Sequence, residues 1–282
     1  MRNKPLYILT EDLNFFYMLK NELDKHNIEF QILNLDAKIP TISAIILTTS
    51  EDIDKLKVRN HNNYLVYSKS YDFKKYIIKV IAAFRIRYKK YYSRLTFSID
   101  PGKKFGLMIF LDDYYLNSYC CFEISEIITI IKQYFETFQE DNQKMMFLDF
   151  KLGRGVLPIT FHLVKQIYSI FHNRKNLRVF LIDEFRSSKI RFSEDHAGRK
   201  FSKDEISALV LAFRNGILVN NINYEGIFKQ IKSKELNIGK LKALKSENDD
   251  DCLSDLKDVV ENVLNGDLAL NNAMKMLNNI ES

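Results

Sequence analysis

An aspartate stands between two apolar, β-prone segments in residues 97–111, which read FSIDPGKKFGLMIFL. The Pro101-Gly102 pair after Asp100 is typical of a tight turn, so the stretch predicts a β-hairpin with strands over residues 95–99 and 107–111. A carboxylate on an apolar segment is costly to bury unless a cation or a hydrogen-bond donor satisfies it. Asp100 therefore either hydrogen-bonds its own turn or belongs to a site.

Alternating strand and helix patterns occupy residues 1–72. β-prone runs at residues 5–9, 30–33, 44–48 and 64–67 are separated by helical patterns over residues 11–25 and 51–56. Such alternation predicts βαβ units and a small parallel α/β domain. The segment resembles a response-regulator receiver in outline, but residues 44–48 hold no aspartate that could accept a phosphoryl group. We interpret this domain as a docking or structural module.

A long basic helix over residues 73–94 is expected to connect this domain to a second one over residues 95–223. The connecting helix interleaves lysine and arginine with tyrosine, which suits either a solvated helix face or a stripe that contacts phosphates and stacks on bases. After the hairpin, the second domain has a strand at 119–122, then helix 125–138, strand 144–150, helix 159–172, strand 178–184 and a helix 204–215 ending at Gly216. This order predicts a mixed sheet, so the fold class is α/β. Residues 224–282 predict a helical C-terminal extension.

Acidic residues end the predicted strands of the second domain or begin its last helix. Because the first and fourth strands can be neighbours, their terminal carboxylates are expected side by side, at the edge where α/β sites form. A divalent cation relieves the repulsion between such carboxylates, and Mg²⁺ and Mn²⁺ prefer oxygen ligands. The residues concerned are Asp100 and Asp149, which end the first and fourth strands, Asp183 and Glu184, which end the fifth, and Asp204 with Glu205, which begin the helix.

Each acid also has a structural explanation. Asp149 can cap the turn at Gly153 and Gly155, and the pair at 183–184 can be solvated strand-end residues. Asp204 follows Ser202 at a helix start, where capping and the helix dipole favour acids. The joint occurrence of the acids in one topological order is what favours a site.

Three motifs in sequence order resemble the RNase H-like superfamily, in its RuvC and YqgF branch. Residues 99–102 (IDPG) with Gly106 resemble the first-strand motif, LIDEFRSS at 181–188 resembles the YqgF motif, and KDEISALVLA at 203–212 resembles the last catalytic helix. The resemblance covers about residues 95–220. The spacing from Gly102 to Gly106 is one residue shorter than in these families.

This resemblance implies an RNase H-like nuclease domain that depends on Mg²⁺ or Mn²⁺, with two ions bound. RuvC proteins place an acid on the fourth strand, where this chain has Asp149, and the YqgF family places one on the fifth, matching Glu184, so the second metal ligand stays open. The implied catalytic residues are Asp100, Asp149, Glu184 and Asp204, and the implied metal ligands are these four with Asp183 and Glu205.

The net charge of +6 and the pI of about 8.9 permit binding to a polyanion. A basic cluster follows the fifth strand and is expected to contact phosphates, on DNA rather than RNA. The lone His196 beside it has the ordinary explanation of an exposed loop residue. The cluster consists of Arg186, Lys189, Arg191, Arg199 and Lys200.

The three cysteines, Cys120, Cys121 and Cys252, form no metal-binding spacing, which favours a reducing, cytoplasmic location. No apolar run is long enough to span a membrane. The leading hypothesis is an endonuclease acting on DNA, with Holliday junctions among its substrates, or on structured RNA. Junction cleavage would require a homodimer. The alternative is a nucleic-acid-binding protein that keeps the fold without catalysis. An ATPase of the actin and sugar-kinase type is disfavoured, because the chain has room for only one of the two lobes.

Overall fold

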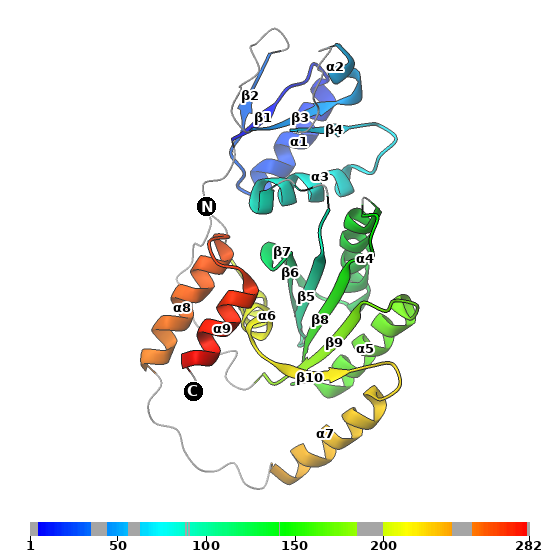
Figure 1. Cartoon of the computed structure of the whole chain (residues 1–282), viewed down its shortest axis with the longest axis vertical. Coiled ribbons are helices and arrows are strands. Elements are labelled where there is room, and N and C mark those ends of the chain that lie inside the picture. Colours follow the sequence, from blue (N-terminus) through cyan, green and yellow to red (C-terminus); the bar gives the residue numbers. More distant parts are fainter. Residues whose placement is uncertain are drawn as a thin grey trace.

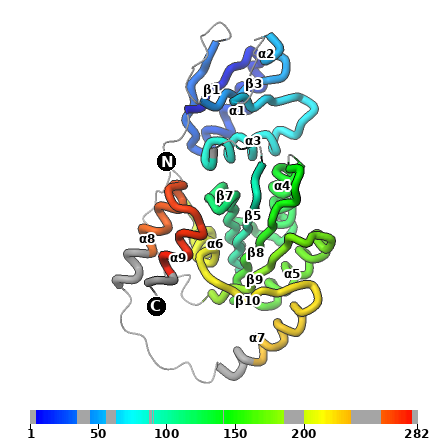
Figure 2. The backbone as a smooth tube through the Cα atoms, in the orientation of Figure 1, coloured from blue at the N-terminus to red at the C-terminus, as the bar shows by residue number. Residues whose placement is uncertain are grey.

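The computed structural model describes residues 5–34, 44–55, 63–87, 89, 91–140, 142–184, 200–238 and 250–280, which form two sheets with their helices (Figures 1 and 2). The mixed α/β layout predicted from the sequence is confirmed. The smaller sheet has the order β2-β1-β3-β4 with all neighbours parallel. Its strands are β1 (Leu6–Ile8), β2 (Gln31–Ile32), β3 (Ile45–Thr49) and β4 (Tyr64–Tyr67), and its helices are α1 (Leu13–Lys25), α2 (Ser50–Lys55) and α3 (Phe73–Ala82).

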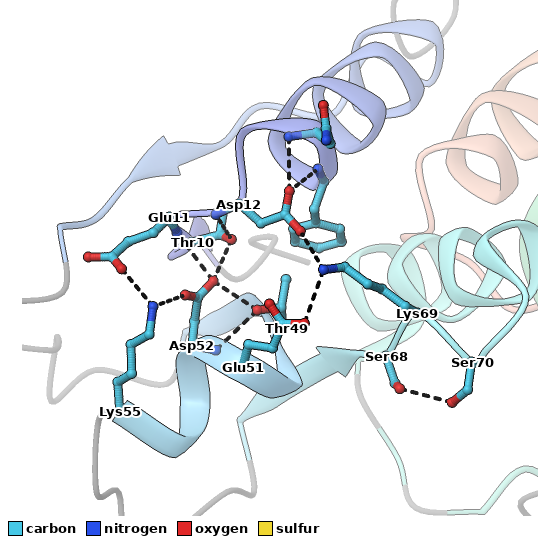
Figure 3. A network of polar contacts seen from close by, with 12 residues as sticks. Thr10, Glu11, Asp12, Thr49, Glu51, Asp52, Lys55, Ser68, Lys69 and Ser70 are labelled. Atoms are coloured by element: carbon cyan, nitrogen blue, oxygen red, sulfur yellow. Dashed lines mark hydrogen bonds and ion pairs between the residues drawn. The ribbon is translucent and has the colours of Figure 1, made fainter.

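A polar network occupies the carboxyl ends of the strands in this small sheet (Figure 3). The buried Asp52 accepts hydrogen bonds from the hydroxyls of Thr10 at 2.6 Å and Thr49 at 2.8 Å. Burial alone would raise the pKa of Asp52, but these bonds and the contact with Lys55 hold it below its usual value. Asp12 is the N-cap of α1, and Lys69 lies 3.6 Å from its carboxylate. The acids here are thus used by caps and ion pairs.

The expectation of one helix over residues 73–94 is wrong. α3 ends at Ala82 and continues as a single π-helical turn, η1 (Ala83–Arg87). By Ser93 the backbone is held by the hairpin turn of the second sheet, because Asp112 Oδ1 accepts from Ser93 N at 2.7 Å and from Arg94 N at 3.1 Å. Arg94 therefore begins a strand.

The larger sheet has six strands in the order β10-β9-β8-β5-β6-β7. β5, β6 and β7 form the predicted antiparallel meander, β5, β8 and β9 are parallel, and β10 is antiparallel to β9. The prediction that the first and fourth strands of this part are neighbours is confirmed by the pairing of β5 with β8. The strands are β5 (Arg94–Asp100), β6 (Phe105–Leu111), β7 (Tyr114–Cys121), β8 (Phe147–Gly153), β9 (Leu177–Ile182) and β10 (Gly216–Val219).

Helices cover both faces of this sheet (Figure 1). α4 (Ile124–Glu140) and α5 (Leu157–Phe171) pack on one face, where Phe97 and Phe150 stack with ring centroids 5.3 Å apart. α6 (Lys203–Phe213) crosses the other face. The extension contains α7 (Tyr224–Ile238), α8 (Asp250–Leu264) and α9 (Leu270–Ile280), and the last two pack on α6. No helix in the described ranges could cross a lipid bilayer.

Two strand boundaries differ from the sequence expectation. Gly216 does not end a helix but begins β10, and a Cβ there would lie 2.4 Å from Ile182 Cδ1 and 2.7 Å from Leu181 O, so β9 approaches too closely for a side chain. β8 continues past Asp149 to Gly153, since Lys151 stays buried under α6 and donates to the carbonyls of Ala212 and Arg214. Asp149 therefore lies inside its strand rather than at its end.

One apolar cluster extends through both sheets. It includes Phe15 and Tyr76 of the small sheet's helices and Phe97 and Phe150 of the large sheet. α3 lies between the two sheets, and its Lys75 also pairs with Glu140 of α4 at 2.5 Å. The two sheets thus share buried contacts through α3.

Candidate active site

A row of paired residues crosses the large sheet at Asp100. Asp100 pairs with Gly106 of β6, which in turn pairs with Cys120 of β7. On the other side, Ile99 pairs with Leu152, so the next residue of β8, Gly153, stands beside Asp100. Alternate residues of a strand face opposite sides, and Ser98, two residues before Asp100, donates to Ala208 O of α6 at 2.7 Å. Asp100 therefore faces α6, with a glycine on each side.

The glycine on β6 sets the position of Asp204. A Cβ at Gly106 would lie 1.8 Å from the carbonyl oxygen of Asp204, so the first turn of α6 rests directly on this strand. Asp204 Oδ2 consequently lies 4.0 Å from Cys120 Sγ, above the same row of the sheet. The close approach of helix and strand brings the carboxylate of Asp204 next to that of Asp100.

The glycines at the end of β8 set the position of Glu184. Its carboxylate lies over Gly153 and Gly155, where an added Cβ would come within 2.2 Å and 2.0 Å of its oxygens. Gly155 N donates to Glu184 Oε1 at 2.7 Å. Asp100, Glu184 and Asp204 therefore gather at one edge of the sheet from three separate elements.

The electrostatics show that these carboxylates interact. Burial and, after it, the charge of Asp204 raise the pKa of Asp100 to about 6, against a hydrogen bond with Ser207 that lowers it. Burial also raises the pKa of Glu184 to about 7, with contributions from Asp100 and Asp183 and opposition from Gly155 N and Arg214. Negative charge is costly at this edge, so a bound cation would be stabilised there.

The donor set suits a hard divalent cation, because three carboxylates supply only oxygen ligands. Within the described part of the chain, no three His, Cys, Asp or Glu side chains are already drawn together closely enough to hold a metal ion. Binding would thus require Asp100, Glu184 and Asp204 to move closer together by side-chain rotation.

Asp149 is not part of this group, and the expectation that it lies beside Asp100 is wrong. It pairs in register with Thr96 and Arg178, four residues before Gly153, or about 13 Å along the strand. Its carboxylate is buried and accepts from Arg178 Nε at 2.7 Å and Nη2 at 2.5 Å. Because β8 continues to Gly153, Asp149 lies away from the end of the strand. There its negative charge is paired with the guanidinium of Arg178 in a bidentate contact.

The two remaining predicted ligands also have other contacts. Both carboxylate oxygens of Glu205 are in use: Oε1 accepts from Ser118 Oγ at 2.7 Å, and Oε2 accepts from Ser202 N at 2.8 Å in a capping box. Asp183 is exposed and pairs with Arg154. The expectation that Glu205 is a metal ligand does not fit this capping geometry, and Asp183 points toward Arg154.

Of the predicted nucleic-acid contacts, only Lys200 is described, and it is exposed. Arg186, Lys189, Arg191 and Arg199 lie outside the described residues, as does His196.

Sequence reasoning did not select Gly106, Gly153, Gly155 or Ser207 as site residues. Gly106 was available as part of the first-strand motif, and Ser207 lies one helical turn after Asp204, so that both share a face of α6. The glycines at 153 and 155 could be assigned only with the position of Glu184 known.

No family model and no curated protein matches this chain. A solved structure of an Argonaute, Aa-Ago with externally bound siRNA, matches at 11% sequence identity and a TM-score of 0.21. The match covers 64% of this chain and 35% of that chain. A likeness at this TM-score carries no argument about function.

Gly153→Ala should move the Glu184 carboxylate without disrupting the fold. The added Cβ would lie 2.2 Å from Glu184 Oε1, the end of a flexible side chain, and 3.0 Å from Leu211 Cδ1. We expect cation affinity, measured by calorimetry, and any cleavage to fall by about 10²-fold, because small misplacements of reacting groups are this costly. The urea midpoint should change little. Wild-type cation affinity in this variant would contradict the placement of Glu184.

The raised pKa values predict a defined pH dependence of stability. The ordinary pKa values are 3.8 for Asp100 and 4.5 for Glu184, and both are raised in the folded protein. Their contribution to stability is therefore complete below about pH 4 and lost as the pH rises through about 6 and 7. Without divalent cations, the double variant Asp100→Asn/Glu184→Gln should gain free energy of unfolding relative to the wild type over this range, measured in urea. A difference independent of pH would contradict this.

Proposed function

We propose that the chain is a metal-dependent endonuclease that hydrolyses phosphodiester bonds in DNA, with branched DNA such as Holliday junctions among its substrates, or in structured RNA. The observation that supports this is the convergence of Asp100, Glu184 and Asp204, since burial and a neighbouring carboxylate oppose the ionisation of both Asp100 and Glu184. Such carboxylates can bind Mg²⁺ or Mn²⁺ near a scissile phosphate. In this proposal the second acid is Glu184, as in the YqgF-like alternative.

The three carboxylates and Ser207 have different proposed roles, which follow from their positions. Asp100 and Asp204, coupled across the contact of β5, β6 and α6, would hold the ions from the sheet side. Bound Mg²⁺ or Mn²⁺, as two ions, supplies a water of lowered pKa and stabilises charge on the leaving oxygen. Glu184 would complete the ligand set, and the bound cation would offset the cost of ionisation that raises its pKa in the metal-free protein. Ser207 orients Asp100 through its hydrogen bond.

The basic cluster supports a polyanionic substrate. The segment that carries Arg186, Lys189, Arg191 and Arg199 joins Glu184 to Lys200, so its two ends belong to the elements that position the carboxylates. We propose that these cations contact phosphates on either side of the scissile bond. A junction substrate would further require a homodimer with two such sites.

The second candidate function is nucleic-acid binding without catalysis. It is favoured by one observation, that no preformed ligand group exists among the described residues. It predicts binding that weakens steeply with salt and does not depend on divalent cations.

Neighbouring acids provide a matched test. Glu184→Gln should lower Mg²⁺- or Mn²⁺-dependent cleavage of branched and linear substrates by about 10²-fold or more, since it removes a ligand from the reacting centre. Asp183→Asn changes the next residue in the same way, but Asp183 is exposed and turned toward Arg154, so cleavage should stay within about threefold of the wild type.

Equal losses in the two variants would exclude Glu184 as the specific ligand. Absence of cleavage by the wild type with either ion, together with cation-independent binding, would favour the non-catalytic candidate.

A further inference from the structure

A second polar cavity lies on the same face of the large sheet, near the start of β8 and β9. It has a volume of about 230 Å³ and opens between the sheet and the first turns of α9. Asp149 and Arg178 are in register with Thr96 across β8, β9 and β5, four residues from the row of Asp100, and Arg94 lies two residues before Thr96. Asp149 and Arg178 therefore lie about 13 Å along the strands from the row of Asp100.

Positive charge exceeds negative charge in this cavity. Its lining includes four cationic side chains and two carboxylates, an excess of two positive charges. Lys151 contributes charge only, because its ammonium is directed to the carbonyls at the end of α6. The charged residues are Arg94, Lys151, Arg178 and Arg214, with Asp113 and Asp149.

The guanidinium of Arg94 can donate a further hydrogen bond. Its Nε is buried and has no hydrogen-bond partner among the described residues. Its two ion contacts, to Asp149 Oδ2 and Asp113 Oδ1, are both 3.6 Å long, beyond hydrogen-bond distance. An unpaired buried guanidinium nitrogen is costly, so an anionic oxygen at this position would be stabilised.

Two guanidinium groups are also held in fixed orientation. Arg94 and Arg178 lie 5.8 Å and 6.0 Å from the centre of the same ring, Phe147, and Arg178 lies 5.6 Å from Phe180. Arg178 Nε and Nη2 already donate to Asp149, so Arg178 contributes mainly positive charge, and Arg94 supplies the nitrogen with no hydrogen-bond partner among the described residues that can donate to a phosphate oxygen. Phe147 is partly exposed, which leaves an aromatic surface beside the cavity.

We propose that this cavity, the phosphate pocket, binds a phosphomonoester group. A phosphomonoester carries about −1.5 to −2 charges at neutral pH, which matches the excess of two positive charges. The volume is below the usual range of about 300–1,000 Å³ for whole-ligand pockets, so the pocket suits one phosphate with its attached sugar. The source is either a free mononucleotide or the terminal phosphate of a nucleic-acid strand.

The test uses the full-length protein in EDTA, so that its outcome does not depend on cleavage or on divalent cations. Binding of inorganic phosphate, AMP and a short single-stranded oligonucleotide with a 5′-phosphate or a 5′-hydroxyl is measured by calorimetry. Stronger binding of the 5′-phosphate strand than of the 5′-hydroxyl strand would assign a strand end. Saturable binding of AMP with no difference between the strands would assign a mononucleotide.

Arg94→Gln should weaken the binding by about tenfold or more, as expected for a lost charged hydrogen bond. Asn271→Asp, on the exposed wall formed by α9, adds a negative charge and should weaken it as well, which covers the possibility that Arg94→Gln perturbs folding. Lys132→Gln on α4 changes net charge equally on the opposite face of the sheet and should have no effect. Saturable binding of none of these probes, or equal weakening by all three variants, would overturn the proposal.

Discussion

Asp100→Asn should abolish metal-dependent cleavage while leaving the fold intact. Asp100 stands between Gly106 and Gly153 with Asp204 and Glu184 on either side, so it is the carboxylate shared by both neighbours. Its replacement removes a charged ligand from the centre of the site, and we expect a loss of about 10³-fold in kcat/KM. Asparagine is nearly isosteric, so the secondary structure should not change.

The free energy of unfolding of Asp100→Asn is the control that separates a loss of catalysis from a loss of folding. Because burial and Asp204 raise the pKa of Asp100 to about 6, its ionised form opposes folding above that pH. The metal-free Asp100→Asn variant should thus be at least as stable as the wild type at about pH 8, measured by urea denaturation. Mg²⁺ or Mn²⁺ should stabilise the wild type much more than the variant. A variant that cleaves like the wild type would end the nuclease proposal.

Gly106→Ala should have the largest effect on stability. The new Cβ would lie 1.8 Å from Asp204 O, 2.3 Å from Asp204 C and 2.9 Å from Glu205 N, all of them backbone atoms that cannot rotate away. Either α6 lifts from β6 or the strands separate. We expect a loss of about 3 kcal/mol in the free energy of unfolding, at the upper end of the cost of overpacking.

Gly102→Ala is the matched control for this substitution. Gly102 lies in the turn of the same hairpin, and its added Cβ would meet only Lys104 O at 3.1 Å. This variant should lose far less stability than Gly106→Ala. Equal urea midpoints for the two would contradict the close contact between α6 and β6.

Sequence patterns predicted the strands of both sheets well, because each strand coincides with a run of apolar, β-prone residues. The hairpin at 95–111 and the pairing of the first and fourth strands follow from β-prone runs and element order, which local physics determines. The position where β8 ends could not be predicted from the sequence. Lys151 is typical of a loop when seen in the sequence, and only the folded structure shows that its ammonium donates to the carbonyls of Ala212 and Arg214. That error moved Asp149 into the predicted site.

The candidate site was predictable in its acids but not in its arrangement. Asp100, Glu184 and Asp204 could be selected from strand ends and motifs, whereas the choice between Asp149 and Glu184 depended on an ion pair with Arg178 that lies far away in sequence. The role of Gly216 could not be predicted from the sequence either. Glycine is needed there because β9 lies too close for a side chain, and that is a tertiary contact.

The apolar cluster that runs through α3 has a consequence for how the protein unfolds. α3 packs on β4 of the small sheet and on α4, which covers the large sheet, and η1 packs on β7, so we expect a loss of packing in either sheet to expose apolar surface of the other. Such sharing predicts that the two sheets unfold as a single cooperative unit, with one calorimetric transition and matched amide-exchange protection on both sides of α3. The N-terminal sheet would then act as a scaffold for the carboxylate sheet rather than as a detachable module.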